Sequence, residues 1–136
     1  MENKIQHLQM IQGVISRMAS NSFMLKGWAV TLVAGIFALA SKDAEKFYFI
    51  IAYIPVLVFW GLDSYYLLQE RLYRSLYEKV RHTEEINIDF SLKATKAEFC
   101  GKTNRIWSCF FSKTELGFYF PLAIACTIIV IITQIK

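Results

Sequence analysis

Few side chains in this sequence have the spacing that catalysis or metal binding requires. His7 and His82 lie far apart in the chain, and Cys100 and Cys109 lack the close pairing of a zinc knuckle. The sequence has no glycine-rich phosphate loop, nucleophile elbow or HExxH motif. One cluster of carboxylates is more typical of a solvated face than of an acid–base pair: Glu84, Glu85 and Asp89. We therefore expect no catalytic residue, no metal site, no cofactor and no enzymatic activity.

Two charged residues are unusual because they lie within or beside apolar stretches. A carboxylate at the centre of a membrane helix costs about 2.5 to 3.5 kcal/mol on insertion scales, so Asp63 should have a partner or water. Lys26 lies near the start of another apolar stretch, on the side of the membrane that Asp63 also reaches, and its ammonium can reach the headgroups. Two interpretations stay open: an ion pair between Lys26 and Asp63, or a polar lining for an aqueous pore.

A further group of candidates would bind phosphate. Basic and aromatic residues are interleaved after residue 92: Lys93, Lys96, Phe99, Lys102, Arg105 and Trp107. Cationic groups bind phosphates and aromatic rings stack on bases, so these residues are candidates for an oligonucleotide or nucleotide site. The alternative is that the same charges determine membrane topology near anionic lipid. The formal net charge of +4 is too small to distinguish the two.

Small residues recur at every fourth position of the first apolar stretch: Gly27, Thr31 and Gly35. Helix backbones approach closely along such a face, because association in lipid depends on packing rather than on hydrophobic drive. The face is predicted either to pack against another helix of the same chain or to form an oligomer interface with a second copy.

The elements that would position these residues are membrane-spanning helices. Hydrophobic residues make up 55% of the 136 residues and the mean hydropathy is +0.36, which is too apolar for most soluble domains of this size. A helix of about 20 residues crosses a hydrocarbon core of roughly 30 Å. We predict an all-α membrane protein with transmembrane helices over residues 23–41, 47–81 and 115–136, the second of which extends into the cytoplasm. Pro55 should kink the second span modestly.

Residues 1–22 and 82–113 should lie outside the bilayer. Apolar residues at helical spacing make residues 1–22 an amphipathic helix, which either lies on the membrane surface or packs against the extension of the second helix. Residues 82–113 form a basic cytoplasmic segment, in which apolar residues at 86, 88, 90 and 92 alternate with polar ones, as in a short strand or an extended segment. Residues 94–107 are predicted to form a short basic helix interrupted by Gly101.

The cytoplasmic extension of the second helix should be a rigid stalk. Glu70 and Arg74 have the i,i+4 spacing and the order of a favourable ion pair. Basic residues also determine the orientation. Nine lie between Arg71 and Lys113, against Lys42 and Lys46 in the first loop. We therefore expect a multi-pass protein of a bacterial inner membrane with its N-terminus in the cytoplasm.

Three stretches resemble a known family: residues 18–23 (MASNSF), 26–32 (KGWAVTL) and 63–77 (DSYYLLQERLYRSLY). In motif and layout, over residues 10–81, the chain resembles a widespread family of small bacterial three-helix membrane proteins of defence loci. Its size and layout resemble the membrane effector subunit of the Hailong anti-phage system. The resemblance implies a homo-oligomer, such as a tetramer, that forms a pore, is restrained by a short DNA oligomer from a partner nucleotidyltransferase, and is released on infection.

Together these interpretations predict an oligomeric inner-membrane effector of anti-phage defence. It would form a pore or ion channel and permeabilise or depolarise the membrane in an abortive infection response. Its partners would be itself, membrane lipid and an inhibitory nucleotide or oligonucleotide. The alternative is a non-conducting membrane anchor or adaptor that recruits a soluble partner through its cytoplasmic segment.

Overall fold

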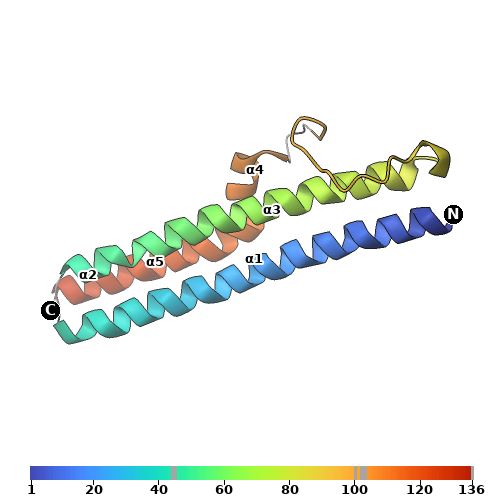
Figure 1. Cartoon of the computed structure of the whole chain (residues 1–136). Coiled ribbons are helices and arrows are strands. Elements are labelled where there is room, and N and C mark those ends of the chain that lie inside the picture. The colour runs from blue at the N-terminus through green and yellow to red at the C-terminus, as the bar shows by residue number, and fades with distance from the viewer. Residues whose placement is uncertain (44–45, 100, 102–103, 136) are drawn as a thin grey trace. The chain divides into compact units, whose positions relative to one another are not determined.

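The computed structural model describes residues 1–43, 46–99, 101 and 104–135 (Figure 1). The regular structure of these residues is entirely helical: α1 Glu2–Asp43, α2 Lys46–Ile51, α3 Tyr53–His82, the 3₁₀ helix η1 Glu85–Asn87, α4 Ile106–Phe110 and α5 Lys113–Ile135. The chain divides into two compact units. Unit 1 consists of Met1–Ser22 and Tyr65–Cys109, and unit 2 consists of Phe23–Ser64 and Phe110–Lys136.

The expected amphipathic helix and the first apolar stretch form one continuous helix, α1, of 42 residues (Figure 1). The division between the units falls at Ser22 and Phe23, yet the helix does not end there. No proline lies in α1, and its run of Ser and Asn residues near position 21 lowers helix propensity without breaking the helix. A change in side-chain character therefore occurs without a change in backbone conformation.

The helix predicted over residues 47–81 is interrupted at a single residue, Ala52. The structure has α2 and α3 on either side of Ala52, with α2 packed against α5. Pro55 explains the position of the break, because it has no N–H to donate to the Ile51 carbonyl and its ring clashes with that group. Pro121 lies inside α5 without ending that helix.

Within the described residues, two helices are long and apolar enough to cross a membrane: Glu2–Leu39 within α1, and Lys113–Ile135, which is α5. Only 11% of the most apolar window of each is buried, whereas the core helix of a soluble protein is mostly buried. The break at Ala52 leaves neither α2 nor α3 with an unbroken apolar stretch of that length.

In unit 1 the N-terminal part of α1 packs against the distal part of α3. Ile11 and Ile15 of α1 form a buried cluster with Leu76 and Val80 of α3. The sequence left two positions open for the amphipathic segment, on the membrane surface or against the extension of the second helix. In the structure this segment packs against that extension. The Lys4 ammonium also donates to the carbonyls of residues 81 and 83, at 3.0 and 2.8 Å, and so satisfies acceptors that the end of α3 leaves open.

The prediction for residues 86–92 was a short strand or an extended segment. Among the described residues no strand forms where residues 86–92 alternate; η1 and an irregular segment occupy that stretch. A strand needs a neighbouring strand for its hydrogen bonds, whereas here Ile88 packs against the Leu76 cluster and Phe90 has a φ of 53°. Of the helix predicted over residues 94–107, the described residues include a turn at residues 96–99 and the start of α4 at Ile106.

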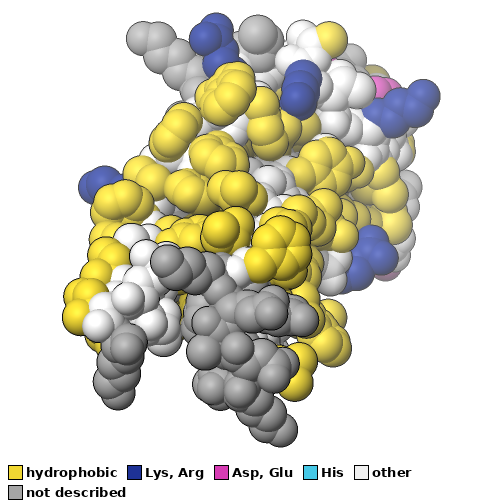
Figure 2. Space-filling model, turned by 90° about the vertical axis from the view of Figure 1, so that its left-hand side faces the viewer, with side chains coloured by type: hydrophobic (Ala, Val, Ile, Leu, Met, Phe, Trp, Pro, Cys, Tyr) yellow, Lys and Arg dark blue, Asp and Glu magenta, His cyan; other side chains and the backbone are white. Residues whose placement is uncertain are grey.

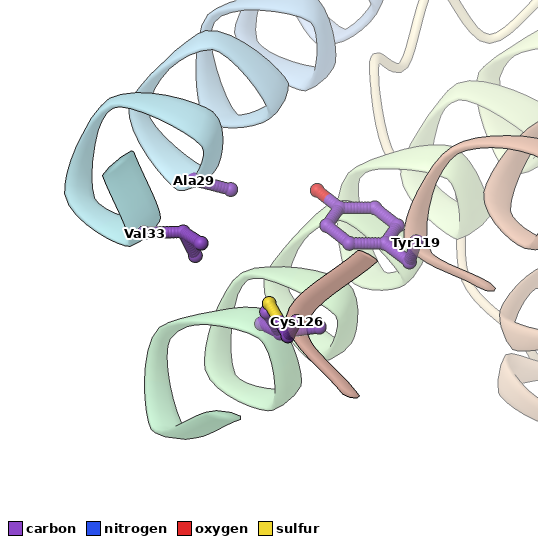
Figure 3. Close-up of a cluster of buried hydrophobic side chains, with 5 residues drawn as sticks. Ala29, Val33, Tyr119 and Cys126 are labelled. Carbon is purple, nitrogen blue, oxygen red and sulfur yellow. The ribbon is translucent and has the colours of Figure 1, made fainter. Parts of the chain in front are cut away.

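Unit 2 has its own core between α1, α3 and α5. The buried members are Ala29, Val33, Val56, Tyr119 and Cys126. Figure 3 shows Ala29 and Val33 on α1 facing Tyr119 and Cys126 of α5. This core determines which side chains of the three helices meet.

Candidate functional site

Unit 2 buries charged side chains and exposes large apolar ones. The Asp63 side chain is 0% exposed and that of Glu115 is 1% exposed, whereas Phe23 is 78%, Trp28 58% and Leu57 61% exposed. Hydrophobic side chains cover most of the described surface that faces the viewer in Figure 2. Water-soluble domains almost never bury unpaired charge and rarely expose large contiguous apolar patches. The distribution in unit 2 is the one that a hydrocarbon environment favours.

The buried charges meet in one cluster, to which each of the three helices contributes. Lys26 comes from α1, Asp63 from α3, and Glu115 and Tyr119 from α5. The Lys26 ammonium forms an ion pair with Oδ2 of Asp63, and it lies 3.5 Å from Oε1 of Glu115. The Tyr119 hydroxyl donates a hydrogen bond to the same Asp63 oxygen at 3.0 Å. We call these four residues the charge cluster.

Helical spacing explains why these side chains converge. Glu115 and Tyr119 are four residues apart on α5, so they lie on the same face, one turn apart. On α1, Lys26 precedes Ala29 by three residues and Val33 by seven, which places it on the face that packs against the other helices. The charges thus lie on the same helix faces as the core of unit 2.

Aromatic rings surround the charge cluster. The Trp60 ring stacks on those of Phe110 and Tyr119, at 4.4 and 5.9 Å between centroids, and its Nε1 donates to the Phe110 carbonyl at 3.0 Å. The Lys26 ammonium lies 5.9 Å from the centroids of the Phe118 and Tyr119 rings, within the range of a cation–π interaction. These rings lower the local dielectric, which strengthens the ion pairs and raises the cost of an unpaired charge.

The cluster holds two carboxyl groups for one ammonium. Oδ2 of Asp63 accepts from both Lys26 and Tyr119, whereas Oε2 of Glu115 is buried without a hydrogen-bond partner among the described residues. No group of three or more possible metal ligands occurs in the described part of the chain. The arrangement can therefore tie three helices together by charge, and its excess of acid is its main chemical property.

An ion pair between Lys26 and Asp63 was one of the two interpretations of the sequence, and the structure contains it. Glu115 and Tyr119 were not among the predicted residues. A signal was present for Glu115, because it begins the third apolar stretch, which was predicted to start on the same side of the membrane as Lys26 and Asp63. Tyr119 follows one turn later. Helical periodicity does not show which of the tyrosines faces the other helices, so Tyr119 is identified only by the packing in the structure.

The small-residue face of α1 has no packing role within unit 2. Gly27, Thr31 and Gly35 are all exposed, and a Cβ added at either glycine would meet no atom within 4 Å. The Thr31 hydroxyl donates to the Gly27 carbonyl of its own helix at 2.8 Å. Among the described residues, no helix of the same chain packs against this face at Gly27 or Gly35.

The predicted phosphate-binding residues are not gathered into one pocket in the described part of unit 1. Lys93 lines a cavity of about 130 Å³ together with Lys79, Asp89 and Glu98. A hydrogen bond from Lys79 to Glu98, with the attraction of that carboxylate, raises the pKa of Lys79. The cavity therefore carries both signs of charge.

The other predicted ligand residues lie elsewhere in the segment or outside the described residues. Lys96 is in the turn, Arg105 is exposed just before α4, and Trp107 on α4 is 69% exposed. Lys102 lies outside the described residues. The stalk ion pair is present, with Arg74 donating to Glu70 at 2.8 and 3.0 Å.

The charge cluster predicts a large and coupled effect of removing its cation. Lys26→Met leaves two buried carboxyl groups without an ammonium and should lower the free energy of unfolding by about 3 to 5 kcal/mol. Adding Asp63→Asn should restore part of that loss, with a coupling of about 0.5 to 3 kcal/mol. Denaturant unfolding in detergent micelles, followed by circular dichroism, measures both. Arg74→Met, which breaks the exposed stalk pair, is the matched control and should cost about 0 to 1 kcal/mol. Equal effects of Lys26→Met and Arg74→Met would contradict a structural role for the cluster.

Comparisons of the chain with protein-family models, with curated proteins and with solved structures give no match in any of the three. The functional assignment therefore depends on the geometry of the two units. In unit 2 that geometry centres on a buried, acid-rich charge cluster inside an apolar exterior, and in unit 1 on a polar cavity beside the stalk.

Proposed function

We propose that this protein is an oligomeric effector of a bacterial inner membrane that forms a pore and permeabilises or depolarises the membrane in anti-phage defence. An inhibitory nucleotide or oligonucleotide keeps it inactive until infection. The observation that carries the proposal is the inverted side-chain distribution of unit 2, with charges buried and apolar residues exposed. Such a unit is stable in hydrocarbon and unstable in water.

The proposal includes three spans, of which the middle one consists of α2 and the first part of α3. The break at Ala52 leaves backbone groups without a helical partner, which a membrane tolerates where neighbouring helices bury them. Packing of α2 against α5 supports such a position. The basic residues between Arg71 and Lys113 then place unit 1 in the cytoplasm and the C-terminus outside.

Reporter fusions test this topology directly. A fusion after residue 90 should show cytoplasmic reporter activity, and a fusion after residue 136 should show external activity, because three spans place these points on opposite sides. Paired cytoplasmic and periplasmic reporters at each point provide the measurement. The same location for both points would exclude three spans.

The exposed small-residue face of α1 supports self-association. Large apolar side chains are solvated by lipid as well as by protein, so they do not favour contact between helices. Two helices therefore associate through close contact of their backbones. Gly27 and Gly35 offer that contact, and neither is used within the protomer. An oligomer built on this face would enclose a path between copies.

Gly35→Leu tests assembly and permeabilisation together. The new side chain has room within the protomer, so folding should be retained while helices of two copies are held apart. Chemical crosslinking should show fewer oligomers, and uptake of a membrane-impermeant dye by induced cells should fall in parallel. Gly117→Leu on α5 is the matched control, since that glycine is also exposed with no atom near its Cβ position. Unchanged crosslinking and dye uptake in Gly35→Leu would rule out this face as the interface.

Control of the pore is assigned to the basic residues of unit 1. Lys93, Lys96 and Arg105, with Lys102, offer several contacts to a phosphate backbone. Restraint by an anionic ligand at these residues would hold the assembly closed. Release of the ligand would then let the helices of unit 2 rearrange so that the charges of the cluster line an aqueous path.

Neutralising these four basic residues together distinguishes restraint from topology. If they hold an inhibitory ligand, ligand affinity should fall steeply, its salt dependence should flatten, and cells should suffer constitutive toxicity at normal membrane insertion. If they only determine topology, the amount of inserted protein should fall and the cells should stay healthy. Growth curves with quantification of inserted protein give the answer. Healthy cells with normal insertion would exclude restraint through these residues.

A non-conducting anchor or adaptor is the second candidate, and one observation favours it. The buried charges of unit 2 contact one another within one protomer, as in a structural tie rather than the lining of an open path. An adaptor would recruit a soluble partner through unit 1 and would leave dye uptake at the level of uninduced cells. The dye measurement on the unmodified protein therefore separates the two.

A further inference from the structure

The charge cluster contains an acid that its neighbours do not neutralise. If both Asp63 and Glu115 were ionised, the cluster would carry one net negative charge. Both carboxyl groups lie almost completely out of contact with solvent. Such a charge is costly in surroundings of low dielectric, and a site of this kind removes it by binding a cation or a proton. The described residues include no further metal-ligand group that would favour a metal ion.

The two carboxyl groups differ in their hydrogen bonds. Asp63 receives two donors on one oxygen, the Lys26 ammonium and the Tyr119 hydroxyl, and such donors stabilise the ionised form. Glu115 has a contact of 3.5 Å from Lys26 on one oxygen, and no described residue donates a hydrogen bond to the other. Protonation is most favourable at a buried carboxyl oxygen that receives no hydrogen bond, because the negative charge there is the least stabilised.

We propose that Glu115 is a proton-binding site, and that the bound proton holds α5 against α1 and α3. The charged and titratable side chains that face Glu115 are Lys26 from α1, Asp63 from α3 and Tyr119 from α5 itself. With Glu115 protonated, the remaining Lys26 and Asp63 charges balance. Loss of the proton to water restores the net negative charge and weakens the contact between the helices.

The proposal determines the sign of the pH effect. The folded protein binds a proton that an unfolded glutamate, with a pKa of about 4.3, has already released near neutral pH. The stability that this site contributes is therefore present at acid pH. It is lost as the pH rises through the range in which the folded protein releases the proton. Over that range the unfolding equilibrium constant should rise by up to about tenfold per pH unit.

Thermal unfolding of the full-length protein in detergent micelles, measured by circular dichroism across a pH series, tests this sign. The Tm of the unmodified protein should fall as the pH rises, and Glu115→Gln, which mimics the protonated acid, should remove that dependence. Asp63→Asn should also remove it, because Lys26 then balances an ionised Glu115. Glu84→Gln, at an exposed carboxylate, is the control and should keep the dependence of the unmodified protein. The same pH profile for the unmodified protein and Glu115→Gln overturns the proposal.

Infrared spectroscopy of the unmodified protein gives a second test that needs no variant. A protonated carboxylic acid should be detected near neutral pH by its carbonyl stretch, which should shift when glutamate carries ¹³C in its side-chain carboxyl group. Absence of the band overturns the proposal, as does a band that shifts with labelled aspartate instead. Neither measurement requires a pore, an oligomer or an inhibitory ligand. A failure here is therefore distinct from a failure of the proposed function.

Discussion

The contact of Lys26 with Asp63 and Glu115 is the interaction on which the arrangement of unit 2 depends. Apolar faces can slide or rotate against one another at small cost in lipid, because lipid tails solvate them as well as protein does. Buried charges cannot, since each must keep its partner or bear a penalty of several kcal/mol. The cluster therefore specifies the register of α1, α3 and α5, and the surrounding core of Ala29, Val56 and Tyr119 fills the space that this register leaves.

The exterior of unit 2 follows from the same physics. Residues such as Phe23 and Leu57 are exposed, which costs little in hydrocarbon, the environment that we propose for unit 2. Specific association of helices then has to come from close packing, for which the uncovered glycines of α1 are suited. One helix thus presents a charge to its own protomer on one face and small residues to the outside on another.

Unit 1 follows the rules of water-soluble packing. Apart from His7, its buried residues, such as Ile11, Leu68 and Leu72, are apolar. Its ion pairs between Glu70 and Arg74 and between Lys79 and Glu98 each have an exposed cation. Such pairs contribute little to stability, so the extension can change its charge partners at small cost. The proposed restraint by an anionic ligand uses this property, whereas the proposed proton site uses the high cost of an unpaired charge in unit 2.

The sequence by itself determined the helical class, the apolar stretches within α1 and α5, and the need of Asp63 for a partner or water, with Lys26 as one candidate partner, because composition, helical period and the cost of an isolated charge are local or nearly local properties. Tertiary structure alone decided the rest. The break at Ala52 depends on how the groups freed by Pro55 are accommodated, and the alternating residues 86–92 had no neighbouring strand to pair with, so they became η1 and an irregular segment on α3. Glu115 and Tyr119 joined the cluster because three helices converge there, and a period of 3.6 residues describes one helix without saying which of its faces meets another.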